Sequence, residues 1–202
     1  AIPLFTGLLN RGIVLALSSP VSASLAESDR LRGLQVDGEP RVAEWVSLSL
    51  RTFALMFDED DAALTAAMQT EAVGRTISRY VDEQTVATKA MLLSRAEQYD
   101  DALAAARQCF DSQVLGQTSK VDSLVPAAKS LAALGRYEEA LDVVEKDFGP
   151  MINALRARLL GCQLAALVLI LHPLQRHERL NELAGVAYAY GHQLLGFDQA
   201  AR

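Results

Sequence analysis

Cysteine is scarce in this chain of 202 residues. Its two cysteines, Cys109 and Cys162, lie far apart, and no CxxC pair or cluster of histidines accompanies them. Two such cysteines give neither the several cysteines of a disulfide framework nor the clustered ligands of a structural zinc site. The three histidines, His172, His177 and His192, form no HExxH motif. We therefore expect reduced, buried thiols and no metal or other cofactor.

Basic residues are also in short supply. The chain has 19 Lys and Arg against 25 Asp and Glu, a net charge of −6, and no basic tract. Such a balance argues against direct nucleic-acid binding by this segment. The longest apolar run, Leu159 to Leu174, contains Gln163, His172 and Pro173 and is shorter than the roughly 20 residues that span a bilayer. We interpret it as a buried packing helix near 150–171 and expect no membrane span.

Motifs of catalysis are missing as well. The sequence contains no GxSxG, and neither cysteine has a recognisable catalytic context. The acidic run from Asp58 to Asp61 lacks the alternating oxygen ligands of an EF-hand loop, so it is interpreted as a solvated turn. The sequence predicts a binding protein rather than an enzyme.

Six prolines and 12 glycines are few for this length, and none of the prolines lies between Arg41 and Val125. Ala, Leu, Glu, Gln, Arg and Met dominate that stretch, and strand-like alternation is nearly absent. The sequence therefore predicts an all-α fold. Its connections are short, which favours antiparallel neighbours. The expected helices are 3–17, 20–34, 40–57, 59–73, 76–96, 98–112, 122–134, 136–147, 150–171 and 174–195.

An internal repeat organises these helices. The segments 96–107 and 134–146 share a Tyr-acid-acid-Ala-Leu core, which aligns Ala102 with Ala140. A weaker copy at 57–68 aligns Ala63 with them at nearly the same spacing, and a truncated copy occupies 196–202. The interval from Ala140 to Ala200 is longer than the others by more than half, which leaves room for an extra helix.

These segments resemble tetratricopeptide repeats, whose turn and second helix carry the same pattern over a slightly shorter period. The resemblance implies a right-handed superhelix of antiparallel helix pairs, a TPR-like solenoid, in one domain over 1–202. The clearest repeats are 76–112 and 122–148. The alternative is an irregular helical bundle with two coincidental turns. Because the chain starts at Ala1 and ends in what looks like the opening of a helix, we expect a piece of a larger protein.

Loose repeats of this length in an Ala-, Arg- and Leu-rich chain also resemble the sensor region of large ATP-dependent LuxR-type transcription regulators of bacteria. This implies a cytoplasmic signalling or regulatory module that binds a protein, a peptide or a small effector, with homo-oligomers as an option. ATPase and DNA-binding functions would lie elsewhere, since no GxxxxGK[ST] motif is present. The alternative is an autonomous scaffold or co-chaperone-like adaptor.

In tetratricopeptide superhelices the first helix of each pair lines the concave surface. Carried over to this sequence, the resemblance places Ala87, Met91, Ser94 and Arg95 of one pair, and Val125 and Lys129 of the next, on that surface. Arg95 and Lys129 are candidates to hold a carboxylate or phosphate, or else are simply solvated. Trp45 is expected to fill the core rather than to stack on a ligand.

Overall fold

The computed structural model describes residues 20–33, 40–56, 59–115, 120, 122–147 and 170–182. Within these ranges the regular structure is helical, with no strand, so the all-α prediction is confirmed. The helices are α2 (Val21–Arg32), α3 (Pro40–Leu55), α4 (Asp60–Arg75), α5 (Arg79–Arg95), α6 (Tyr99–Asp111), α8 (Leu124–Ala133) and α9 (Tyr137–Asp142). A π-helical turn, η1 (Val143–Asp147), continues α9, and residues 177–182 are also helical.

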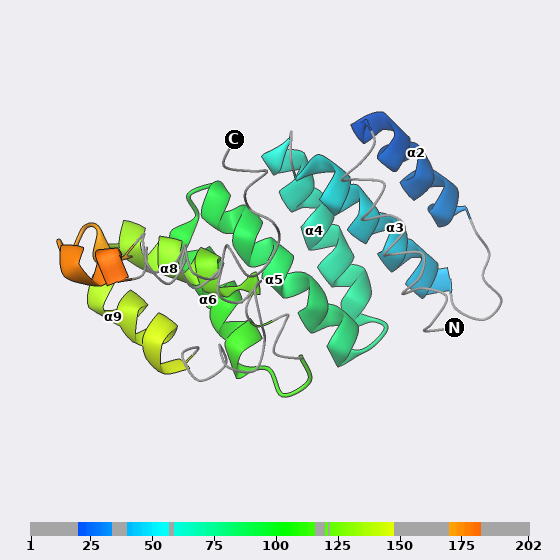
Figure 1. The fold of residues 1–202 in the computed structure, drawn as a ribbon. Helices are drawn as coiled ribbons and strands as arrows, with labels where there is room; N and C mark the ends of the chain where they lie inside the picture. Colours follow the sequence, from blue (N-terminus) through cyan, green and yellow to red (C-terminus); the bar gives the residue numbers. More distant parts are fainter. Residues whose placement is uncertain are drawn as a thin grey trace.

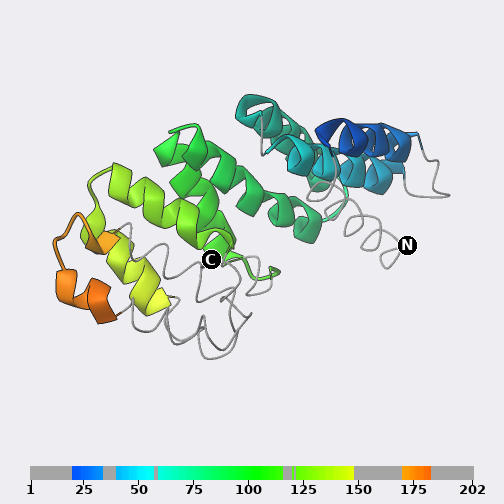
Figure 2. The same cartoon turned by 45° about the horizontal axis from the view of Figure 1, so that its top comes forward.

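Helices that follow one another in sequence pack against one another. Each helix from α2 to α9 contacts the next described one, and α5 also contacts α8. Figure 1 shows the resulting row, with α2 at one end and residues 170–182 at the other. In Figure 2 the same row is seen from another side as a series of helix pairs. The pairs are the hairpins α3–α4, α5–α6 and α8–α9, so α3, α5 and α8 are the first helices.

Some sequence predictions lie outside the described residues. They are the helix at 3–17, the truncated repeat at 196–202 and most of the long apolar helix near 150–171. The last two residues of that helix, Ile170 and Leu171, are buried. Among the helices that the structure describes, none is long and apolar enough to cross a membrane.

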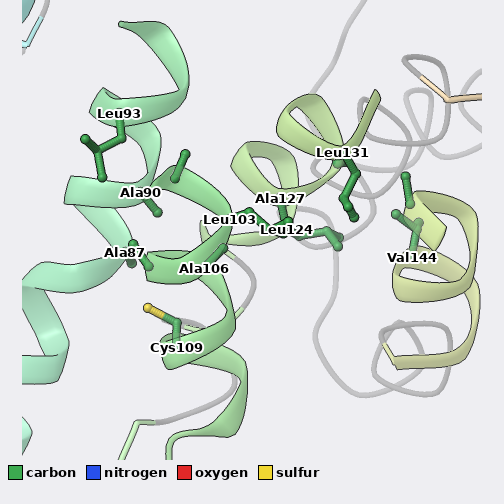
Figure 3. Close-up of a cluster of buried hydrophobic side chains, with 14 of the residues drawn as sticks. Ala87, Ala90, Leu93, Leu103, Ala106, Cys109, Leu124, Ala127, Leu131 and Val144 are labelled. Carbon is green, nitrogen blue, oxygen red and sulfur yellow. The ribbon is translucent and has the colours of Figure 1, made fainter. Parts of the chain in front are cut away.

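Small side chains at equivalent positions let the helices approach closely. In α4, in α6 and in α9 with its continuation η1, the repeat alanine and the residue one turn later are fully buried. Since an alanine has only a Cβ, two helix backbones can approach one another there without a void. Figure 3 shows the core that results, where alanines of α5, α6 and α8 alternate with leucines. The repeat alanines are Ala63, Ala102 and Ala140, and the residues one turn later are Ala67, Ala106 and Val144.

The first two helices approach through serine rather than alanine. Ser28 Oγ donates to the Ser47 carbonyl at 2.8 Å, and Ser47 Oγ donates to the Ser28 carbonyl at 2.7 Å. These reciprocal hydrogen bonds satisfy two buried hydroxyls. A similar close approach occurs at Gly74, where a Cβ would lie 3.2 Å from the backbone of Asp82. Close packing of α2 with α3, and of α4 with α5, thus depends on these small residues.

Candidate binding surface

The turns inside the α5–α6 and α8–α9 hairpins share one backbone geometry. In the α8–α9 turn, Gly135 has a φ of +73°, the Arg136 amide donates to the Leu131 carbonyl at 2.8 Å, and the Gly135 amide donates to the Ala132 carbonyl at 3.0 Å. This pair of hydrogen bonds is a Schellman motif. In the α5–α6 turn, Glu97 has a φ of +60° and the Gln98 amide makes the equivalent bond, at 2.9 Å.

A third copy of this turn lies where the sequence analysis found no repeat. Gln175 has a φ of +55°, and the Arg176 amide donates to the Leu171 carbonyl at 3.1 Å. The Gln175 amide donates to the His172 carbonyl at 3.0 Å, which completes the Schellman motif. The left-handed positions 97, 135 and 175 are therefore almost evenly spaced along the chain. The long interval after Ala140 contains a further repeat turn.

The predicted surface residues differ in their exposure. Ser94 is 2% exposed, and Ala87 lies in the hydrophobic core with 6% exposure, so neither side chain faces solvent. Met91 is half-buried and packs against the cluster around Leu92. Val125 is half-buried on α8, one helical turn before Lys129. The accessible part of the predicted surface is thus Met91 with Arg95 on α5 and Val125 with Lys129 on α8.

Arg95 is engaged with the preceding hairpin. Its Nε donates to Asp60 Oδ2 at 3.1 Å, and its Nη2 forms an ion pair with Oδ1 at 2.6 Å. The remaining Nη1 donates to the Met56 carbonyl at 2.5 Å, just beyond the last residue of α3. Arg95 therefore holds together the end of α3 and the start of α4.

Lys129 makes the corresponding contact one hairpin later. Its Nζ donates to the Ser94 carbonyl at 3.1 Å, in the last turn of α5. Since cations stabilise the carbonyl end of a helix dipole, Lys129 stabilises α5 as Arg95 stabilises α3. The structure thus brings Ser94, Arg95 and Lys129 together at one helix end. Sequence analysis placed the two cations on one surface but did not find their carbonyl partners.

Buried charges lie between α4 and α5. The Glu71 carboxylate, whose side chain is 5% exposed, accepts from Lys89 Nζ at 2.7 Å and also binds Arg75. Burial raises the pKa of Glu71, but hydrogen bonds and charge from Lys89 and Arg75 outweigh it, so the pKa lies below its ordinary value. Burial is the main cause that raises the pKa of the neighbouring Asp82. This network is an internal contact between two hairpins rather than an open site.

Two further predictions concern single residues. Trp45 is 9% exposed and its Nε1 donates to Thr85 Oγ1 at 3.3 Å, so the prediction that it fills the core is confirmed. Cys109 is a free, fully buried thiol, and burial raises its pKa. Cys162 lies outside the described residues. The part of the chain that the structure describes contains no group of His, Cys, Asp and Glu that would hold a metal ion.

No family model, curated protein or solved structure matches the chain. The residues and contacts described above therefore carry the argument for function.

Proposed function

We propose that this chain is a TPR-like superhelical repeat module that binds a partner or effector on the face formed by its first helices, as part of a cytoplasmic signalling or transcription regulator. The observation that carries the proposal is the turn that recurs at residues 97, 135 and 175 with the same backbone geometry. The buried alanines at 63, 102 and 140 support it, because they repeat with nearly the same period.

A stack of such hairpins has a physical consequence for binding. Each hairpin buries its apolar side against its neighbours, and the first helices of successive hairpins lie next to one another, as α5 and α8 do. The surface that they share carries the half-buried apolar Met91 and Val125 beside the cations Arg95 and Lys129, each of which has more N–H donors than its contacts with the protein use. A ligand that suits it is elongated, partly apolar and negatively charged, such as an acidic peptide or a carboxylate or phosphate effector.

The alternative function is a scaffold or adaptor that has no small effector. The two functions differ in what stabilises the folded chain, because a ligand that prefers the folded state raises its melting temperature by mass action. We expect a rise in melting temperature with at least one member of a panel of acidic peptides and of carboxylated or phosphorylated small molecules. A response only to a folded protein partner would favour the adaptor.

Substitutions test whether the binding site lies on the face formed by the first helices. Met91→Glu and Val125→Glu introduce negative charge on the first-helix face, and we expect each to abolish the stabilisation by an acidic ligand. Ala104→Glu is the matched control, because Ala104 is exposed on the second helix α6. A ligand whose stabilisation is lost in Ala104→Glu and kept in the other two variants would contradict the proposed face.

A further inference from the structure

Two cations on first helices make the same kind of contact with the hairpin before them. Arg95 of α5 donates to the Met56 carbonyl at the end of α3, and Lys129 of α8 donates to the Ser94 carbonyl at the end of α5. Each contact joins residues of successive repeats. In both, a charged donor meets the helix end at which carbonyl groups lack partners within the helix.

The two contacts share the last turn of α5. Ser94, which accepts from Lys129, directly precedes Arg95, which binds Met56 and Asp60. If the last turn of α5 frays, the backbone that positions the Arg95 side chain moves with it. The contact of α8 with α5 therefore affects the contact of α5 with α3.

The first helices α3 and α5 also contact each other at a second place. Trp45 in the first half of α3 donates to Thr85 in the first half of α5, so these helices are linked near both ends. The second helices contribute a different kind of link, the ion pair of Arg107 with Glu139 at 2.6 Å, whose side chains are 53% and 39% exposed. An ion pair so open to solvent contributes little to stability.

We infer that Arg95 and Lys129 form a relay along the first helices, through which order in the α8–α9 hairpin is transmitted by way of α5 to the end of α3. In this arrangement the two cations are positioning residues that hold the stack in one geometry. A change at Lys129 then reaches the α3–α4 turn, two hairpins away, without unfolding the core.

Amide hydrogen exchange on the full chain tests the relay. Lys129→Met keeps an unbranched apolar side chain as far as the ε position and removes the charged amine. We expect the amides of Ala96 and Gln98, which donate to the last turn of α5, to exchange about fivefold faster. The Glu59 amide, which donates to the Leu55 carbonyl at 2.8 Å, should exchange about twofold faster.

Two variants serve as controls. Lys129→Arg keeps a cation that can reach the Ser94 carbonyl and should restore slow exchange. Arg107→Met removes an inter-hairpin cation that makes the exposed ion pair, and it should leave the Glu59 and Gln98 amides unchanged. Unchanged exchange at Gln98 in Lys129→Met, unchanged exchange at Glu59, or an equal acceleration of all amides including those of the α6 core would each overturn the relay.

Discussion

Replacing Gly135 by alanine tests the turn on which the repeat assignment depends. Gly135 has a φ of +73°, and a Cβ added there would have no heavy atom within 4 Å. The cost of Gly135→Ala is therefore conformational and not steric. A left-handed conformation costs an L-residue about 1–2 kcal/mol, and the stiffer unfolded chain returns about 0.4–1 kcal/mol. We expect the free energy of unfolding to fall by about 1 kcal/mol.

The equivalent residue of the preceding turn should respond in the opposite direction. Glu97 is exposed, has a φ of +60° and occupies the position of Gly135. Glu97→Gly relieves the left-handed strain but loosens the unfolded chain, so the free energy of unfolding should rise by about 0.5–1 kcal/mol. For a chain of this length, about 1 kcal/mol corresponds to a change in melting temperature of about 2–4 °C.

Gly33 provides the matched control. It follows α2 with a φ of −78°, and an added Cβ would make ordinary contacts, the nearest at 3.6 Å from the Arg30 carbonyl oxygen. Gly33→Ala should therefore be neutral or stabilise by up to about 1 kcal/mol. Urea unfolding followed by circular dichroism measures all three variants at once. A Gly135→Ala variant as stable as Gly33→Ala, or a Glu97→Gly variant less stable than the parent, would refute the reasoning.

Three further outcomes are expected in the core. Ala102→Leu overfills a fully buried site and should lower the free energy of unfolding by about 1–3 kcal/mol, whereas Ala104→Leu on the exposed face of α6 should stay within about 0.5 kcal/mol. Leu131→Ala, at another fully buried site, should cost about 2–5 kcal/mol in thermal melts. Because the pKa of Glu71 lies below 4.5, its ion pairs stabilise fully above that pH and are lost as the pH falls through the folded pKa. Glu71→Gln should therefore lose less stability than the parent on acidification below pH 4.5.

The helices that the structure describes could be predicted from the sequence, from composition and the scarcity of proline. The first and last residues of each helix were harder to predict. The helix expected at 76–96 begins at Arg79, since Ser78 is its N-cap and accepts from the Val81 amide at 3.3 Å. The helix expected at 136–147 is present but ends in the π-helical turn η1. Pro126 is the third residue of α8, in the first turn, where a proline is tolerated.

The third repeat turn was missed because its two most recognisable residues are replaced. Gln175 stands where the α8–α9 turn has Gly135, and His177 stands where it has a tyrosine. Other residues still match when the two turns are aligned, since Leu131, Leu134, Arg136 and Glu138 correspond to Leu171, Leu174, Arg176 and Glu178. The copy at 96–107 was found although it has Glu97 at the left-handed position, because it keeps the tyrosine and the alanine of the shared core. The third copy has His177 and Leu180 at those positions.

The partners of Arg95 and Lys129 could not be predicted for a different reason. Both cations bind main-chain carbonyls, and every residue of a helix offers the same carbonyl. Side-chain patterns therefore place a cation on a face without showing which helix end it reaches. Asp60 and Arg95, which form an ion pair, lie close to one repeat apart in the sequence. Sequence alone does not distinguish such a paired arginine from a solvated one.

The period of this repeat has more than one structural origin. A tetratricopeptide repeat has about 34 residues. The intervals between the turns at 97, 135 and 175 are longer, and each exceeds that period by at least the number of residues in one helical turn. Between the repeat alanines Ala63 and Ala102, which are 39 residues apart, the extra residues lengthen helices, since α4 has 16 residues and α5 has 17. Between Ala102 and Ala140, which are 38 residues apart, α8 has only 10 residues. Because helices of unequal length give nearly equal spacing of the buried alanines, helix length alone does not set the period.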